Sequence, residues 1–215
     1  GYNTSYAVAY GNWVKAVDAF TSKSVWLPFS GYAAALYTRN DSVAYPWGAP
    51  AGPNRGTITG IVDIAINPQQ KQRDLLYKIS VNPVVNFPTE GFSIQGQKTL
   101  LKAPSAFDRV NVRRLFLFLE KSVLNTSKAF VFEPNTTFTR SRLVNTIKPV
   151  FELAKNTQGV YDYLIVCNDT NNTAAVIDDN SLVVDIYIKP VKTAEFILVN
   201  FYATKTSQNF QELVQ

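Results

Sequence analysis

The clearest pattern of hydrophobic and polar positions lies in the middle of the chain, between residues 107 and 127. Asp108 is a candidate N-cap, because a short carboxylate can accept hydrogen bonds from the free amides of a first helical turn. Phe107 is placed to pack against Val112 as a hydrophobic staple. The pattern predicts an amphipathic helix that ends at residues 125–127. Its apolar stripe would be Val112, Leu115, Phe116, Leu119 and Val123.

A second helix is predicted over residues 137–156. Its apolar positions recur at helical spacing, at Leu143, Ile147, either Val150 or Phe151, and Ala154. Pro149 lies inside this segment and has no backbone N–H, so we expect a kink or a restart there. The short segment between the two helices, residues 130–133, is predicted to be a buried strand that ends at Pro134.

The last third of the chain is predicted to be rich in strands. Residues 161–167, 182–188 and 196–203 carry β-branched and aromatic side chains on both faces, which is typical of a sheet covered by helices. The aromatic side chains of these strands are therefore expected in the core. They are Tyr161, Tyr163, Tyr187, Phe201 and Tyr202.

The first 100 residues predict shorter elements. Residues 5–10 and 13–17 are expected to pair as a hairpin, with a further hairpin formed by residues 84–87 and 92–95. Other strands are expected at 25–27 and 57–66. Helices are expected at 30–39, closed by Asn40 and Asp41, and at 68–80, with Leu75, Leu76 and Ile79 on its buried side. The segment 45–56 around Trp47 is predicted to be an ordered irregular loop or a subdomain boundary. Trp47 is a candidate for a contact, although a self-packed loop is favoured.

Together the elements predict an α+β fold, a mixed β-sheet flanked by helices. With 215 residues, 46% of them apolar, the chain can form a packed core. No apolar run approaches the length needed to span a bilayer. Because the chain begins at Gly1 and contains no Met, we expect sequence upstream of it to be missing.

The residue types present argue against most catalytic chemistry. The chain has no His and one cysteine, Cys167, which excludes His-based nucleophile pairs, His metal sites and an internal disulfide. Asp169, Asn171 and Thr173 imitate a calcium loop whose later positions do not match. The adjacent Asp178 and Asp179 are expected in a solvated turn. We therefore expect no enzyme activity, no metal and no cofactor.

The most specific phrase in the sequence is Asn111-Val-Arg-Arg-Leu-Phe116. With several other segments, it resembles one family, the contractile tail sheath proteins of T-even-like myoviruses. The others are Gly-Asn-Trp at 11–13, Arg-Asn-Asp at 39–41, Ala-Gly-Pro-Asn-Arg-Gly at 51–56, Gln-Arg-Asp-Leu-Leu-Tyr at 72–77, Phe-Glu-Pro-Asn at 132–135, Phe-Thr-Arg-Ser at 138–141 and Val-Cys-Asn-Asp-Thr-Asn-Asn-Thr at 166–173. They follow the family order over nearly the whole chain and correspond to the C-terminal part of such proteins.

The resemblance implies a structural subunit of the virion tail, assembled in the host cytoplasm. Copies would polymerise as stacked hexameric rings in a helical sheath around a tail tube protein, bounded by baseplate and tail terminator proteins, and contraction would drive the tube through the host envelope. It implies a subdomain at 1–100 and a C-terminal sheath domain at 101–215. No binding to nucleic acid or to membrane is implied.

The resemblance also implies terminal segments that add strands to the sheets of neighbouring subunits. Residues 204–215 would be such an arm, anchored by Phe210, Leu213 and Val214. A hypothetical contact set for the tube or for neighbouring subunits lies on the second long helix. Its members are Arg140, Arg142, Lys148 and Lys155. The arginines of the central phrase, Arg113 and Arg114, are likewise expected to contact protein partners.

Three alternatives remain open at the level of sequence. A sheath-like subunit of a related contractile injection system would share the same phrases. A basic nucleic-acid-binding module would use the net charge of +5, although the Lys and Arg residues are spread along the chain. A hydrolase that uses Asp carboxylates would need a cleft with strongly perturbed acids.

Overall fold

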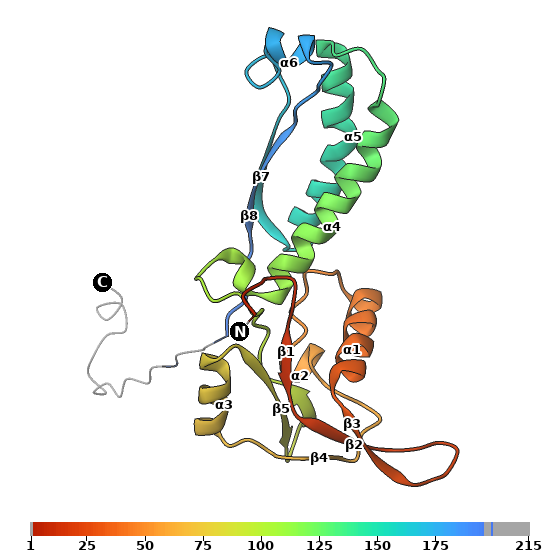
Figure 1. The fold of residues 1–215 in the computed structure, drawn as a ribbon, viewed down its shortest axis with the longest axis vertical. Coiled ribbons are helices and arrows are strands. Elements are labelled where there is room, and N and C mark those ends of the chain that lie inside the picture. Colours follow the sequence, from red (N-terminus) through yellow and green to blue (C-terminus); the bar gives the residue numbers. More distant parts are fainter. Residues whose placement is uncertain (1, 196–198, 200–215) are drawn as a thin grey trace, which may run out of the picture.

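The computed structural model describes residues 2–195 and residue 199. Figure 1 shows an elongated molecule with two lobes stacked along its long axis. The N-terminal lobe holds six short strands and three helices, and the C-terminal lobe holds two long helices packed against a two-stranded sheet. Helices and mixed sheets confirm the α+β prediction.

Two small sheets form the N-terminal lobe. One has the order β1-β5-β6, in which β1 runs parallel to β5 and β5 antiparallel to β6. The other has the antiparallel order β3-β2-β4. The strands are β1 (Ala9–Gly11), β2 (Trp13–Val17), β3 (Ser24–Pro28), β4 (Asp63–Ile64), β5 (Val81–Phe87) and β6 (Gly91–Ile94).

Three helices accompany these sheets: α1 (Ser30–Val43), α2 (Gly52–Arg55) and α3 (Gln70–Lys78). The core between the sheets and α1 is apolar. β2 buries alternate side chains, whereas β5 buries consecutive residues in its middle and β6 buries its last two. The buried members of this core are Val14, Phe29, Ala33, Leu36, Ile58, Ile64, Val84 and Ile94.

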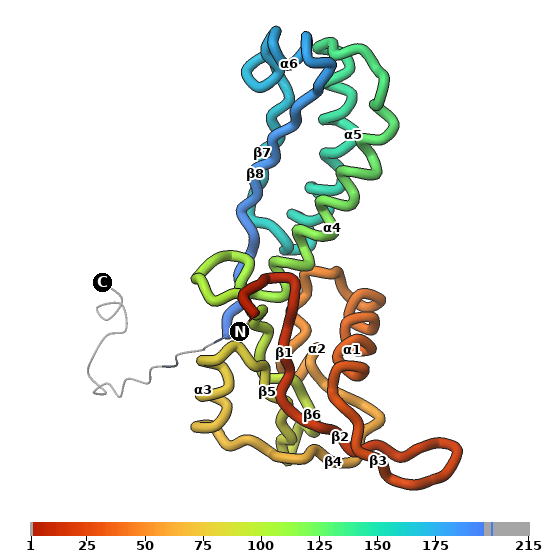
Figure 2. The backbone as a smooth tube through the Cα atoms, viewed as in Figure 1, coloured from red at the N-terminus to blue at the C-terminus, as the bar shows by residue number. Residues whose placement is uncertain are grey.

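The C-terminal lobe is built on α4 (Val110–Ser127) and α5 (Thr137–Asn156). Against them packs a sheet of β7 (Val160–Val166) and β8 (Asp185–Pro190), which Figure 2 shows running beside the two helices. The short helix α6 (Ala174–Asp178) connects β7 to β8 in the sequence and lies at the far end of the lobe (Figure 1). The buried core of this lobe is Leu115, Leu119, Leu143, Ile147, Phe151, Ala154 and Val160, and it also contains Trp47 from the N-terminal half.

Several predicted elements are confirmed. The helix over residues 137–156 has the predicted bounds and continues through Pro149 without a restart. Val112, Leu115 and Leu119 are buried on α4, as the apolar stripe predicts. The hairpin of β5 and β6 forms with Val84 opposite Ile94.

The caps and short strands are where the predictions are wrong. Asp108 lies in a short 3-10 turn capped by Ser105, and Arg109 occupies the N-cap position of α4. Residues 130–133 form a turn instead of a buried strand. Residues 5–10 do not pair with 13–17, because β1 finds a parallel partner in β5.

Other differences concern length and exposure. α1 continues to Val43, past the predicted stop at Asn40, because the Asn40 side chain is buried and donates to the Arg55 carbonyl oxygen at 3.1 Å. Within 57–66 only Asp63–Ile64 is a strand. Leu75 and Ile79 are exposed instead of buried. The predicted strand at 196–203 lies, apart from residue 199, outside the described residues.

Candidate assembly surfaces

The sheet of β7 and β8 is open on one face and along both edges. Within the part of the chain that the structure describes, each of these strands pairs only with the other. Tyr163 and Ile165 face the helices, whereas Leu164 and its cross-strand neighbour Tyr187 are exposed. A two-stranded sheet with unpaired edges is a ready template for further strands.

This exposed face corrects the prediction of a covered sheet. Tyr161 and Tyr187, expected in the core, are each more than 60% exposed, and only Tyr163 of the described strand aromatics packs inward. The helices cover one face of the sheet, so the β-branched and aromatic side chains on the other face are left without cover from the residues that the structure describes.

Arg140 is the one member of the predicted basic contact set that is buried. Its side chain is 4% exposed, and its guanidinium donates to Asp169 at 2.5 Å, Asn135 at 3.2 Å and Thr137 at 3.3 Å. These bonds fasten the loop after β7 to the first turn of α5. Asp169, part of the predicted calcium-like loop, thus serves as the partner of an arginine.

The other three members of the set, Arg142, Lys148 and Lys155, are exposed on α5. Lys155 donates to the Asp162 carboxylate at 2.9 Å, and this hydrogen bond is the main cause that lowers the pKa of Asp162. Arg142 lies over the rings of Phe130 and Phe138. The predicted arm anchors Phe210, Leu213 and Val214 lie outside the described residues.

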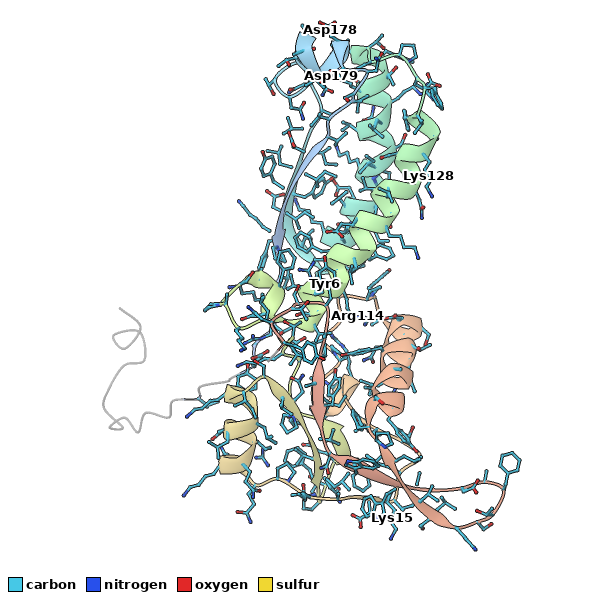
Figure 3. All side chains as sticks on the ribbon, in the orientation of Figure 1. Tyr6, Lys15, Arg114, Lys128, Asp178 and Asp179 are labelled. Carbon is cyan, nitrogen blue, oxygen red and sulfur yellow. The ribbon has the colours of Figure 1, made fainter. Side chains whose placement is uncertain are left out.

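The two arginines of the central phrase have their partners inside the chain. Arg114 donates through one nitrogen to both oxygens of Asp41, at 2.7 and 2.6 Å, and so joins α4 to α1 at the junction of the lobes (Figure 3). Arg113 donates to Ser5 at 2.6 Å and lies 4.0 Å from the ring centre of Phe107. Both arginines therefore have a structural role within the chain, and the expectation that they contact protein partners stays a prediction.

A third arginine connects the segment after β8 to the N-terminal lobe. Arg109 forms hydrogen bonds to both carboxylate oxygens of Glu195, at 2.6 and 3.0 Å, and to the Tyr77 hydroxyl at 3.0 Å. Burial is the main cause that raises the pKa of Tyr77 well above its usual range. This cluster is a structural clamp between the lobes.

Across the described ranges, 2–195 and 199, no group of three or more Cys, Asp or Glu side chains is arranged to hold a metal ion. Among the helices described there, none is long and apolar enough to cross a membrane. Asp178 and Asp179 are exposed at the far end of the C-terminal lobe (Figure 3), as expected, but Asp178 is the last residue of α6 instead of part of a turn. The features of interest are surfaces.

Two family models match consecutive parts of the chain. Residues 2–100 match the phage tail sheath protein central domain, and residues 102–204 match the phage tail sheath C-terminal domain. The chain belongs to the phage tail sheath family. The tail sheath protein of Vibrio phage KVP40 is 42% identical over 212 residues, and that of Enterobacteria phage T4 is 39% identical over 211 residues. These alignments cover 99% and 98% of this chain, which spans about a third of the length of these relatives, 32% of each.

Solved sheath structures share the fold. The sheath complex of an extracellular contractile injection system in its contracted state aligns with a TM-score of 0.85 at 24% identity, over 98% of this sheath chain and 58% of that one. The contracted helical sheath of the anti-feeding prophage aligns with a TM-score of 0.83 at 22% identity, over 94% and 57% of the two chains. A sheath tail protein from Listeria innocua gives 0.60 at 10% identity, over 88% and 44%.

Sequence reasoning missed two residues that the structure brings forward. Trp47, assigned to a self-packed loop, is buried in the core of the C-terminal lobe. Phe132, assigned to a buried strand, is fully exposed in a turn. The signal available for Trp47 was a large aromatic in a loop rich in Pro and Gly. For Phe132 it was Pro134, two positions later, which argues against a strand.

Proposed function

We propose that this chain is a structural subunit of a contractile tail sheath. Copies polymerise as stacked hexameric rings around a tail tube protein, bounded by baseplate and tail terminator proteins, and the sheath shortens to drive the tube through the host envelope. The subunit assembles in the host cytoplasm, becomes part of the virion tail, and needs no enzyme activity. The match of both family models along the chain carries this proposal.

The open sheet of β7 and β8 supports linkage between subunits by strand addition. Its unpaired edges offer backbone donors and acceptors, and its exposed Leu164 and Tyr187 offer side-chain contacts. A terminal segment of a neighbouring copy would extend this sheet, with main-chain hydrogen bonds giving affinity. Strand pairing would hold neighbours together while the lattice changes from its extended to its contracted arrangement.

The arm is tested by deleting residues 204–215. The deletion is expected to abolish polymerisation, since a neighbouring sheet loses its added strand. A length-matched variant, with serine in place of Phe210, Leu213 and Val214, separates anchoring from length and is expected to weaken polymerisation by at least about tenfold. Polymers of normal yield and length from the deletion would remove the arm from the proposal.

The exposed lysines of α5 are our proposed contact with the tube. Lys148 and Lys155 are exposed, as suits a charged surface that separates from its partner and forms again during contraction. Arg140 is left out because it is buried. Changing Lys148 to Glu should weaken co-assembly with the tube, whereas Lys71→Glu on the exposed face of α3 should not. Unchanged co-assembly of the Lys148→Glu variant with the tube would contradict this assignment.

A sheath subunit of a related contractile injection system is a second candidate. The similarity in fold to sheaths of such systems favours it. Micrographs of assembled particles decide between the two, because a phage tail carries a capsid and an injection system does not. A nucleic-acid module is less well supported, because Arg109, Arg114 and Arg140 are engaged in internal ion pairs.

A further inference from the structure

The turn between α4 and α5 places an aromatic residue where glycine is normally required. The Glu133 amide donates to the Phe130 carbonyl oxygen at 3.2 Å and closes a four-residue turn. Val131 has φ −66° and ψ 132°, and Phe132 has φ 69°. These values describe a type II turn, whose third residue must adopt positive φ and is therefore usually Gly or Asn. For a bulky side chain this conformation is strained.

The backbone strain at Phe132 is not offset by packing of its side chain against the described residues. Its side chain is fully exposed, with a relative accessible area of 102%. An apolar ring in water and a left-handed backbone are both unfavourable, and a Gly at this position would avoid both. Sequences generally agree with their local structure except where a residue serves a function. Phe132 is therefore a candidate for a contact made only after assembly.

The neighbours of Phe132 complete an aromatic and cationic surface. Val131 and Phe138 are 60% and 71% exposed. The guanidinium of Arg142 lies 5.4 Å from the ring centre of Phe130 and 6.0 Å from that of Phe138. Within the described residues Arg142 has no acidic partner. We call Phe130, Val131, Phe132, Phe138 and Arg142 the Phe132 surface; aromatic and Arg side chains of this kind dominate binding energy at protein interfaces.

A surface of complementary chemistry lies on the N-terminal lobe, at the other end of the molecule. Trp13 and Trp26 are 55% and 45% exposed on the outward face of β2 and β3. Lys15 of β2 pairs across strands with Trp26 of β3 on one side and with Asp63 of β4 on the other. Cross-strand partners point to the same face, so the exposed Asp63 shares this face. We call Trp13, Trp26 and Asp63 the Trp face. It offers two indole rings and a carboxylate to an aromatic side chain with a neighbouring guanidinium. Lys15 lies between Trp26 and Asp63 on the same face, with its ammonium 5.7 Å from the ring centre of Trp26.

We propose that the Phe132 surface of one copy docks on the Trp face of the next copy, with Phe132 against the indoles and Arg142 paired with Asp63. This rests on the proposed function. The two surfaces differ and lie on opposite lobes (Figure 1), so the contact is heterologous and can propagate as a ring or helix. A neighbouring copy suits this surface better than the tube, because permanent interfaces are more hydrophobic than transient ones and neighbouring copies stay together through contraction.

The first test replaces Phe132 by Gly in the full-length protein. Polymer yield is measured by sedimentation and electron microscopy, without tube protein. We expect the yield to fall at least about tenfold while the melting temperature stays the same or rises by about 2–4 °C, because Gly relieves the strained φ. Phe20→Ala, which truncates an equally exposed Phe outside both surfaces, is the matched control and should polymerise normally.

The second test exchanges the charges and does not depend on the turn. Arg142→Asp and Asp63→Arg should each reduce polymer yield, and the double variant should recover most of it. Normal polymer from Phe132→Gly, an equal loss from Phe20→Ala, or no recovery in the double variant overturns the contact. Loss of tube binding with intact polymerisation also overturns it, in favour of the tube. A wild type that never polymerises overturns the proposed function itself.

Discussion

The indole nitrogen of Trp47 donates a hydrogen bond of 3.2 Å to the carbonyl oxygen of Thr157, which lies 110 positions later in the sequence. The ring also stacks on Tyr45 at 4.9 Å and meets Phe118 edge-on at 5.5 Å. A side chain from the N-terminal half thus completes the core of the C-terminal lobe. The two lobes are joined by buried packing, which suits a subunit that must move as one body when a lattice rearranges.

Gly159 is the residue that allows this packing. A Cβ at this position would lie 2.8 Å from the nearest Trp47 ring atom, and the ring is buried and cannot give way freely. Gly159→Ala is therefore expected to lower the free energy of unfolding by about 1–3 kcal/mol. Urea denaturation measures it. Gly31→Ala is the control, because its Cβ would meet nothing within 4 Å, and it should be neutral or mildly stabilising. Equal effects of the two changes would contradict this role of Gly159.

The ion pair of Arg114 and Asp41 is expected to couple α4 to α1. Both side chains are partly exposed, so the interaction should be modest, and a double-mutant cycle with Arg114→Ala and Asp41→Ala should give a coupling energy of about 0.5–1.5 kcal/mol. It should weaken at high salt. A coupling energy near zero at low salt would show that the pair does not join the lobes.

Asn82 is expected to be among the most sensitive polar residues of the N-terminal lobe. Its fully buried amide donates to the carbonyl oxygens of Ala9 and Lys98, at 3.1 and 2.8 Å, and accepts from the Lys98 amide at 2.7 Å. Asn82→Ala leaves these backbone groups unpaired and should cost about 2–4 kcal/mol of stability, measured by urea denaturation. The exposed Asn54→Ala serves as control. A loss below about 0.5 kcal/mol for Asn82→Ala would contradict this account.

Cys167 provides a pH-dependent probe, because it is the single thiol of the chain. Burial is the main cause that raises its pKa above the usual value. The folded protein should therefore react with iodoacetamide more slowly at pH 8 than the same protein in urea. Because the folded pKa lies above the unfolded one, the thiol's contribution to stability is complete below the unfolded pKa, near 8.5, and declines as pH rises toward the folded pKa. Equal alkylation rates in the two states would contradict the burial.

The sequence predicted the long helices well and the short elements poorly, for identifiable reasons. α5 and the stripe of α4 follow from repeated apolar spacing, which twenty residues define clearly. The turn at Phe132 could not be found this way, because a Phe at positive φ contradicts local preference. The parallel pairing of β1 with β5 depends on residues some 70 positions apart. No local pattern specifies such a partner.

The predictions for the candidate surfaces were likewise correct where a local pattern decides and wrong where a distant partner decides. Charge and helical spacing placed Lys148 and Lys155 on an exposed face of α5, where the structure has them. The same reasoning placed Arg140 outside, because its spacing did not reveal Asp169, 29 positions away, as its partner. The exposed outer face of β7 and β8 was read as core, since apolar side chains on both faces look alike whether a helix or another subunit covers them.

The most direct test of the central claim is electron microscopy of the purified full-length protein, with and without its tube protein. A sheath subunit should form hollow tubes with a regular axial repeat and helical or ring symmetry, in which density for β7 and β8 continues into a strand from a neighbouring copy. Particles that stay monomeric across salt, pH and protein concentration, with or without the tube, would contradict the account.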